Sequence, residues 1–445
     1  MGIFNHEFLI EDKDNIFKND KLNRDSDICK LTKLFKAVDN QMVLAIDSPW
    51  GTGKTTFLKM WEAQLKKDGY STVYFNSWKN DFVEDPYIAF IGEIKSQVDD
   101  RFIGEKFRES AKNLGMNLVK ALPKASMKFI ENKTGFSIED YYSSDDFKEL
   151  IGNKIDEYEK SKNSVENFKA ELKNLSSKIK KETSTNSVEG KPLVIFVDEL
   201  DRCRPNFAIL LLERIKHFFN VENIIFILGI DREALSNSIK VIYGDGTDIN
   251  GYLTRFIDLE YTLSQEYNRE YINYLIDKYR FNQIASIDYS SFRHNFSGCI
   301  QAFNLSLRDT EKIISKLYLL FSTIGIRPKK INLIMFMLIL YKVNKEAYIN
   351  IKLRNTTVVK LLEVLPEGIN KWFYDSYEEG YIVEANLIYI LSDKDRIEHK
   401  KRLVEENKSN EANEKGIRYY ESLYKEGNFY IDDILKYITD FIEIM

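Results

Sequence analysis

The sequence is poor in cysteine and histidine. Its 445 residues contain three cysteines, Cys29, Cys203 and Cys299. An odd number of widely spaced cysteines provides neither a disulfide framework nor a zinc site, and it fits a reducing compartment. The four histidines are far apart from one another, which argues against a histidine-based metal centre. On these grounds we expect a cytoplasmic protein.

A strong charge of one sign and a long apolar run are also missing. The net charge of −5 argues against a nucleic-acid-binding surface over the whole molecule, so nucleic acid stays open as a partner but is not indicated. The most apolar segment, residues 331–341, is about half as long as the roughly 20 residues that cross a bilayer. We expect it to be a buried helix. The first residues lack the charged start and apolar run of a signal peptide, so we expect a soluble protein without a membrane anchor.

The composition that remains is that of a folded protein, with 44% apolar and 13% aromatic residues and a length that allows two or three domains. A glycine-rich segment, residues 48–56, lies between two patterned stretches. Residues 42–46 are apolar and predict a buried strand, and the apolar spacing of residues 57–65 predicts a helix. Strand, glycine-rich turn, Lys-Thr and helix is the context expected of a phosphate-binding loop. The alternative is an ordinary strand–turn–helix with a chance Gly-Lys-Thr.

Each residue type in this segment suits phosphate binding. Gly51 and Gly53 allow a tight turn that aims backbone N–H groups inward, next to a helix N-terminus. Lys54 places an ammonium on the β- and γ-phosphates, and the hydroxyl of Thr55 is a ligand for Mg²⁺. Ser48 stands where the usual pattern begins with Gly, and Ser tolerates a positive φ poorly. The predicted nucleotide-binding residues here are Ser48, Trp50, Gly51, Thr52, Gly53, Lys54, Thr55 and Thr56.

A second motif closes another apolar run. Residues 193–197 read as a strand buried on both faces, and Asp198-Glu199-Leu200-Asp201-Arg202 follows at once. An acid at the end of such a strand, downstream of a phosphate-binding loop, is suited to hold Mg²⁺ through its water shell. We assign that role to Asp198. The neighbouring Glu199 is then the residue that orients or deprotonates the attacking water.

Two further strands are expected at residues 71–76 and 224–230, and residues 252–260 are expected to run from a helix end into a fifth strand. Five strands that alternate with helices predict a three-layer α/β domain with a mostly parallel sheet. Trp78, just after one strand, is expected to be a packing residue. Asp231, at the tip of another, is either a sensor of the γ-phosphate or the cap of the next helix, with the cap favoured.

Two regions depart from this alternation. Residues 100–190 contain no convincing strand. From residue 151 the apolar spacing predicts a helix of about seven turns, with a gap in the pattern at Lys162 and a polar linker from Lys180 onward. A helical hairpin and a short coiled coil both fit that segment. From residue 264 only helices are predicted, and Arg308 falls in the first turn of one of them, where a cation opposes the helix dipole.

Together these motifs resemble the KAP family of P-loop NTPases, which belongs to the additional-strand, catalytic-glutamate class and is related to AAA+ and STAND ATPases. The resemblance spans about residues 20–265 and the helical part near Arg308. It rests on Trp50-Gly51-Thr52-Gly53-Lys54-Thr55-Thr56, Phe75-Asn76-Ser77-Trp78, Asp198-Glu199-Leu200-Asp201-Arg202-Cys203 and Ile230-Asp231 with Tyr252-Leu253.

The family resemblance implies ATP as the ligand, a sheet in the order 5-1-4-3-2, and a helical lid. By the same likeness Arg24 lies near the adenine. Arg255 resembles the arginine that a neighbouring subunit presents to the γ-phosphate, and Arg308 resembles the lid's sensor arginine, so a homo-oligomer is implied. Glu199 stands where many members carry a second Asp. Many members insert transmembrane helices where this chain has a polar insert, so a membrane anchor is not carried over.

The resulting expectation is a cytoplasmic, Mg²⁺-dependent ATPase in which Lys54, Glu199, Arg255 and Arg308 act in catalysis. It drives or regulates a partner protein encoded nearby, in the phage-defence context in which bacterial members are often found. One alternative is a nucleotide-gated oligomerising scaffold with negligible turnover, and a weaker one is a DNA-loading ATPase. The expected domains are a 1–19 arm, a 20–265 core with its helical insert at about 100–190, a 266–345 helical lid and a 346–445 C-terminal helical region.

Overall fold

The structure is a computed structural model, and its chain divides into two compact units. The N-terminal unit ends at residue 265, and the C-terminal unit begins at residue 266. The structure describes residues 15–18, 20–35, 41–83, 85–119, 154–184, 190–264, 269–283, 289–324, 331–375, 380–406 and 408–426.

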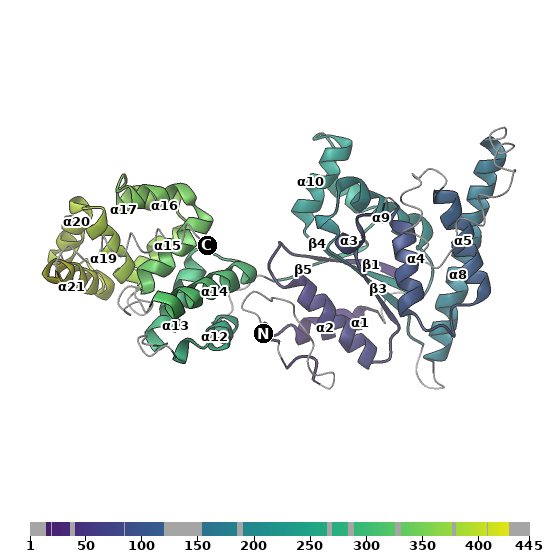
Figure 1. The fold of residues 1–445 in the computed structure, drawn as a ribbon, viewed down its shortest axis with the longest axis horizontal. Helices are drawn as coiled ribbons and strands as arrows, with labels where there is room; N and C mark the ends of the chain where they lie inside the picture. Colours follow the sequence, from purple (N-terminus) through teal and green to yellow (C-terminus); the bar gives the residue numbers. More distant parts are fainter. Residues whose placement is uncertain are drawn as a thin grey trace. The chain divides into compact units, whose positions relative to one another are not determined.

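A five-stranded sheet forms the centre of the N-terminal unit (Figure 1). The strands lie in the order β2-β3-β4-β1-β5, and all four neighbouring pairs are parallel. Read from the other edge this is 5-1-4-3-2, so the predicted fold class and strand order are confirmed. The strands are β1 (Gln41–Asp47), β2 (Thr72–Asn76), β3 (Leu193–Asp198), β4 (Ile224–Ile230) and β5 (Leu259–Thr262).

Side chains alternate between the two faces of the central strands. In β3, Val194 and Phe196 pack on one face, and Ile195 and Val197 pack on the other. Every residue of β3 and β4 is buried, whereas the edge strand β5 is mostly exposed. Helices must therefore cover both faces of the central strands, as in other parallel sheets.

Two layers of helices provide that cover (Figure 1). The first layer contains α1 and α2, and Trp61 of α2 packs against Phe196 of β3. The second contains α4, α9 and α10, and Phe90 of α4 packs against Phe226 of β4. The helices of the unit, apart from the insert, are α1 (Asp25–Leu34), α2 (Lys54–Lys67), α3 (Ser77–Asn80), α4 (Pro86–Gln97), the 3-10 helix η3 (Leu200–Arg202), α9 (Pro205–Phe218), α10 (Arg232–Tyr243) and α11 (Ile249–Leu253).

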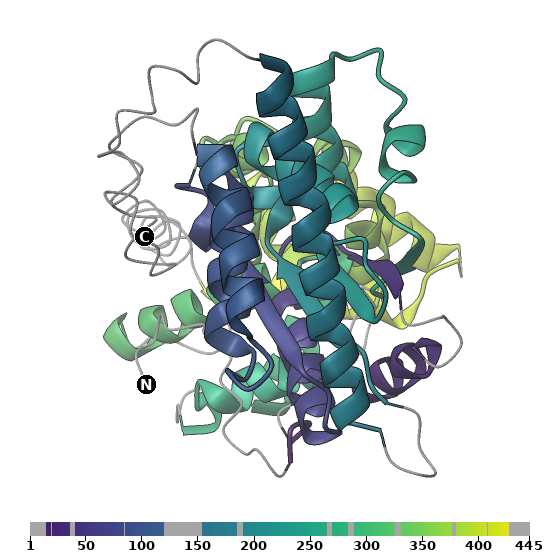
Figure 2. The same ribbon diagram turned by 90° about the vertical axis from the view of Figure 1, so that its right-hand side faces the viewer.

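The insert between β2 and β3 contributes two long helices that lie side by side, α5 (Glu105–Val119) and α8 (Lys154–Glu182) (Figure 2). Phe107 of α5 packs against Phe168 of α8 in the same core as α4. The helix α8 is continuous through Lys162. The apolar pattern has a gap at this position because Lys162 is exposed. The helix α8 also extends past Lys180, so the polar linker begins later than predicted.

The described part of the C-terminal unit is helical. A single apolar cluster runs from Ile272 to Leu423, so the predicted lid and the predicted C-terminal region share one core. As expected, α15 is buried, from Ile331 to Leu340. The elements are α12 (Arg269–Lys278), the 3-10 helix η4 (Phe281–Gln283), α13 (Tyr289–Ala302), α14 (Leu307–Ile324), α15 (Ile331–Val343), α16 (Lys345–Lys352), α17 (Val358–Val364), α18 (Glu367–Phe373), α19 (Gly380–Ile390), α20 (Lys394–Glu405) and α21 (Glu411–Glu426).

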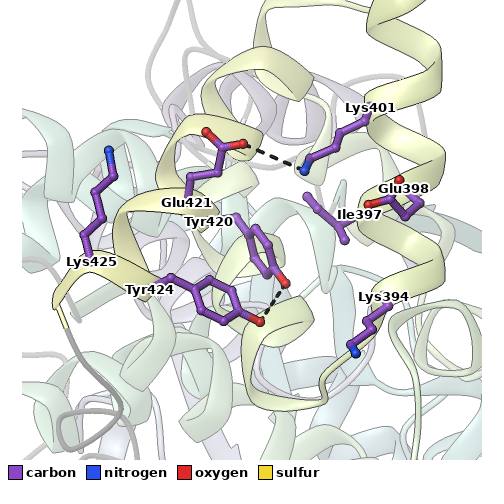
Figure 3. Close-up of a pocket in the computed structure, with 8 residues that line it drawn as sticks. All are labelled: Lys394, Ile397, Glu398, Lys401, Tyr420, Glu421, Tyr424 and Lys425. Carbon is purple, nitrogen blue, oxygen red and sulfur yellow. Dashed lines mark hydrogen bonds and ion pairs between the residues drawn. The ribbon is translucent and has the colours of Figure 1, made fainter.

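A groove of about 510 Å³ lies between α20 and α21 (Figure 3). Ile397 and Tyr420 are its buried residues, and the Tyr420 and Tyr424 hydroxyls are 3.0 Å apart. Charged side chains of both signs complete the lining, so the groove does not define a class of ligand by itself. These are Lys394, Glu398, Lys401, Glu421 and Lys425.

Across the described residues, no helix combines the length and the apolar character that spanning a membrane requires.

Candidate nucleotide-binding site

The glycine-rich loop connects β1 to α2 at the carboxyl end of the sheet. Gly51 and Gly53 have φ values of 86° and 89°, a region that glycine enters without steric cost. Ser48 is not among the described non-glycine residues with positive φ, so a serine at this position is compatible with the loop. It is buried, and its hydroxyl is hydrogen-bonded to that of Thr52, which in turn donates to the Pro49 carbonyl at 2.8 Å.

The Lys54 side chain turns back toward this loop. Its ammonium donates to the Ser48 carbonyl at 2.8 Å and lies 3.8 Å from Oδ1 of Asp201. Burial lowers the pKa of Lys54, and the negative charges of Asp201, Asp231, Asp198 and Asp47 oppose that shift, in decreasing order. Carboxylates from the ends of three strands therefore surround one buried lysine. A buried cation needs such compensation to stay charged.

Asp198 is the last residue of β3 and is fully buried. Its Oδ2 accepts a hydrogen bond from the Tyr74 hydroxyl at 2.6 Å, and its Oδ1 accepts one from the backbone N–H of Glu199 at 2.8 Å. Burial raises the pKa of Asp198, and hydrogen bonds from Tyr74 and from the side chain of Thr55 oppose that effect. The fold thus brings together Thr55 and Asp198, the two residues predicted to hold Mg²⁺.

Glu199 adopts a left-handed backbone conformation, with φ at 60°. Few non-glycine residues do so, and such conformations cluster at functional sites. Its Oε2 accepts a hydrogen bond from Nδ2 of Asn76 at 2.8 Å, and its Oε1 pairs with Arg202 at 2.7 Å. Asn76 ends β2 and is paired in register with Asp198. Two side chains from different elements therefore fix the direction of the Glu199 carboxylate.

The model of the KAP family P-loop domain matches residues 24–324 of this chain, which is more than half of its length. The chain belongs to the KAP family of P-loop NTPases. An uncharacterised protein of Methanocaldococcus jannaschii is 27% identical to this KAP-family chain in an alignment 173 residues long, which covers 36% of this chain and 89% of that protein. A solved structure, the Aeropyrum pernix ORC2 protein in ADPNP–ADP complexes, covers 88% of this chain and 89% of its own, with 12% identity and a TM-score of 0.34.

The KAP-family site offers oxygen donors of the kind that Mg²⁺ prefers. Among the described residues no group of three or more His, Cys, Asp or Glu side chains forms a complete metal site. Protein-bound Mg²⁺ usually keeps several waters and uses one or two protein groups together with substrate phosphates. The Asp198 carboxylate beside the Thr55 hydroxyl fits that requirement. Both belong to the chain segments that carry the phosphate-binding loop and the acidic motif.

Other predicted site residues have structural contacts or lie apart. Trp50 is 51% exposed, and its indole Nε1 donates to Oδ2 of Asp201. Thr56 lies in the first turn of α2. Arg24 is buried, and its guanidinium donates to the Ser264 carbonyl at 2.7 Å, just beyond β5. A role for Arg24 at the adenine stays a prediction.

The two predicted arginines of the catalytic set lie in different units. Arg255 is exposed and follows α11 in the N-terminal unit. Arg308 lies in the first turn of α14 in the C-terminal unit. Their roles toward the γ-phosphate stay predictions. Asp231 caps α10 by accepting a hydrogen bond from the Ala234 N–H at 3.2 Å, which agrees with the favoured expectation for that residue.

Several contacts of the site were missed from the sequence. Tyr74 and Asn76 extend from β2 to the two acidic residues after β3, and Arg202 bonds Glu199. Trp78 was expected to be a packing residue, but it is 56% exposed and lies beside the guanidinium of Arg202, 5.8 Å from ring centroid to Cζ. The alternation of side chains in a strand, which places Tyr74 on the same face of β2 as Asn76, is a signal that could have found it.

Gly229 of β4 permits close packing behind the site. A Cβ added to it would lie 2.5 Å from Cδ1 of Leu58, 3.0 Å from Oδ1 of Asp198 and 3.6 Å from Cγ of Lys54. Any larger residue at this position must therefore push against Leu58, Asp198 and Lys54 themselves.

We expect Gly229→Val to weaken ATP binding by about tenfold and to cost about 1–3 kcal/mol of unfolding free energy, because overpacking displaces Lys54 and Asp198. Equilibrium binding and thermal unfolding measure the two effects. Gly246→Val is the matched control, since nothing lies within 4 Å of a Cβ there. Unchanged ATP binding by a folded Gly229→Val protein would show that this contact does not position the site.

Proposed function

We propose that this KAP-family chain hydrolyses ATP with Mg²⁺ and uses the reaction to drive or regulate a partner protein. The arrangement of Glu199 carries the proposal. Its carboxylate is fixed by Asn76 and Arg202, beside the Asp198–Thr55 pair, at the end of the sheet where the phosphate-binding loop also lies. A passive nucleotide binder has no need for a second acid held in this way.

Each group has a specific task in this proposal. The loop N–H groups and the Lys54 ammonium bind the β- and γ-phosphates. Thr55 and Asp198 hold Mg²⁺, which neutralises charge on the phosphates when it is bound. Glu199 orients the attacking water and accepts its proton at the carboxylate. Tyr74 and the Glu199 backbone N–H keep the Asp198 carboxylate in place.

Positive charge at the γ-phosphate is proposed to come from two arginines. Arg255 is exposed, so a second copy of the chain can present it to a neighbouring site. Arg308 is the candidate from the C-terminal unit. An arginine supplied in trans contributes about 10³–10⁵ to the rate in related phosphoryl transfers. We therefore propose that a homo-oligomer turns over faster than the isolated chain, and that the partner is a nearby-encoded protein, with antiphage defence as the context.

Equilibrium binding of labelled ATP, with phosphate release followed over a range of protein concentrations, tests the proposal. Lys54→Ala should weaken ATP binding by about tenfold to a hundredfold, because charge-assisted hydrogen bonds of about 1.5–3 kcal/mol are lost. Lys66→Ala, in the last turn of the same helix and paired with Glu62 at the surface, should bind as the parent does.

The outcomes separate the candidate functions. Release per chain that rises with protein concentration supports an ATPase that works as an oligomer. Binding and assembly with a non-hydrolysable analogue, but no measurable release, would replace it with the nucleotide-gated scaffold. Equal ATP binding by Lys54→Ala and the parent protein would refute nucleotide binding at this site.

A further inference from the structure

Asp201 links two parts of the phosphate-binding loop. It lies in η3, and its side chain is 1% exposed. Its Oδ2 accepts a hydrogen bond from the indole of Trp50, and its Oδ1 lies 3.8 Å from the ammonium of Lys54. One carboxylate therefore contacts a residue before the two glycine turns and the lysine after them.

The two oxygens of the Asp201 carboxylate differ in their hydrogen bonds. Oδ1 is buried and has no hydrogen-bond partner among the described residues, so its compensation is the charge of Lys54. A buried carboxylate is costly unless a charge or hydrogen bonds compensate it. In turn, the charge of Asp201 is the largest of those that oppose the lowering of the Lys54 pKa by burial. Each group depends on the other.

The same ammonium is the group expected to bind phosphates. A lysine ammonium has three N–H donors, and one of them already goes to the Ser48 carbonyl. Phosphate oxygens that approach Lys54 must compete with Asp201 for it, and they also bring negative charge close to a buried carboxylate. Like charges in such a position repel each other strongly, because a buried pair is poorly screened.

We propose that Asp201 is a positioning residue that couples nucleotide binding at Lys54 to the exposed indole of Trp50. Phosphates that engage Lys54 weaken its pairing with Asp201, and the carboxylate and the indole bonded to it readjust. This inference rests on the proposed nucleotide binding at Lys54. It adds that the charge of Asp201 limits the affinity for nucleotide. It also adds that the exposed indole of Trp50 changes its position when nucleotide binds, at a surface where a partner protein can contact it.

The test uses tryptophan emission of the full chain, with labelled ATP binding measured separately. The chain has four tryptophans, Trp50, Trp61, Trp78 and Trp372. ATP with Mg²⁺ should change the emission of the parent protein. Trp50→Phe should abolish that change, whereas Trp78→Phe, which removes an equally exposed indole that is not hydrogen-bonded to Asp201, should retain it.

Asp201→Asn is the decisive variant. Asparagine keeps the size and an acceptor for the indole but removes the charge that holds Lys54. We expect ATP to bind about threefold tighter or more, because the repulsion is gone, and the emission change on binding to be lost. Thermal unfolding checks that the variant is folded, and the Trp50→Phe comparison applies whatever its stability.

The results distinguish this inference from the function on which it rests. If the parent protein binds labelled ATP but Trp50→Phe retains the full emission change, the coupling is wrong and nucleotide binding stands. Weaker ATP binding by folded Asp201→Asn, with the emission change intact, would also overturn it. If the parent binds no ATP, the proposed function fails and this inference fails with it.

Discussion

Replacing Glu199 with Gln should reduce steady-state phosphate release by about 10²–10⁴-fold while ATP binding stays as in the parent protein. Glutamine has the same size, and its carbonyl oxygen accepts the hydrogen bond from Asn76, but its NH2 group replaces the oxygen that pairs with Arg202. It cannot accept a proton from water at neutral pH. The loss should therefore fall on turnover and not on affinity.

Phosphate release at saturating ATP and binding of labelled ATP measure these two quantities on the same preparation. Glu233→Gln is the matched control, because Glu233 is exposed in the first turn of α10, and it should leave both unchanged. Undiminished release by Glu199→Gln would take Glu199 out of the reaction.

The parallel sheet could be predicted from the sequence because its central strands are unusual. β3 and β4 are continuous apolar runs, buried at every position, and each ends in an acidic motif. Strand order could not be obtained from periodicity, since apolar alternation does not say which strands are neighbours. It came from the family likeness, and the structure confirms it.

Helix limits were less predictable, and some helices, α13 among them, were missed. α13 (Tyr289–Ala302) buries Asn295 and Ser297 along with its phenylalanines, so its apolar pattern is interrupted by polar residues that are themselves in the core. The Asn295 Nδ2 donates to the Ser291 carbonyl at 3.0 Å within the same helix. A polar residue that bonds within its own helix in this way reads as surface when only the sequence is considered.

The residues within each motif of the candidate site could be predicted, but the contacts between residues of different motifs could not. Gly51, Gly53 and Lys54 follow from local loop geometry. By contrast, the bond between Trp50 and Asp201 joins residues 151 positions apart, and the bond between Tyr74 and Asp198 joins residues 124 apart. Such contacts depend on strand order and register, which bring the strand ends to one edge of the sheet.

The C-terminal unit contains a second group of buried charges, which predicts a large effect on stability. Glu384 of α19 is 1% exposed and pairs with Lys400 at 2.6 Å and with Arg396 at 2.8 Å. Lys400, also 1% exposed, donates in addition to Asn413 of α21 at 2.7 Å. Burial lowers the pKa of Lys400, and the charge of Glu384 opposes that shift. One carboxylate therefore compensates two cations between three helices.

Replacing Glu384 with Ala should lower the unfolding free energy of the C-terminal unit by about 3–5 kcal/mol, because Lys400 and Arg396 are left without their counter-charge. Glu367→Ala is the control: it breaks a surface pair with Lys371, 85% and 76% exposed, and should cost at most about 1 kcal/mol. Since the chain has two units, unfolding of the full chain need not be two-state, and hydrogen exchange of the α19 and α20 amides reports the relevant opening. Equal exchange rates in Glu384→Ala and Glu367→Ala would mean that water or the neighbouring polar groups compensate both cations, and that the carboxylate does not hold these helices together.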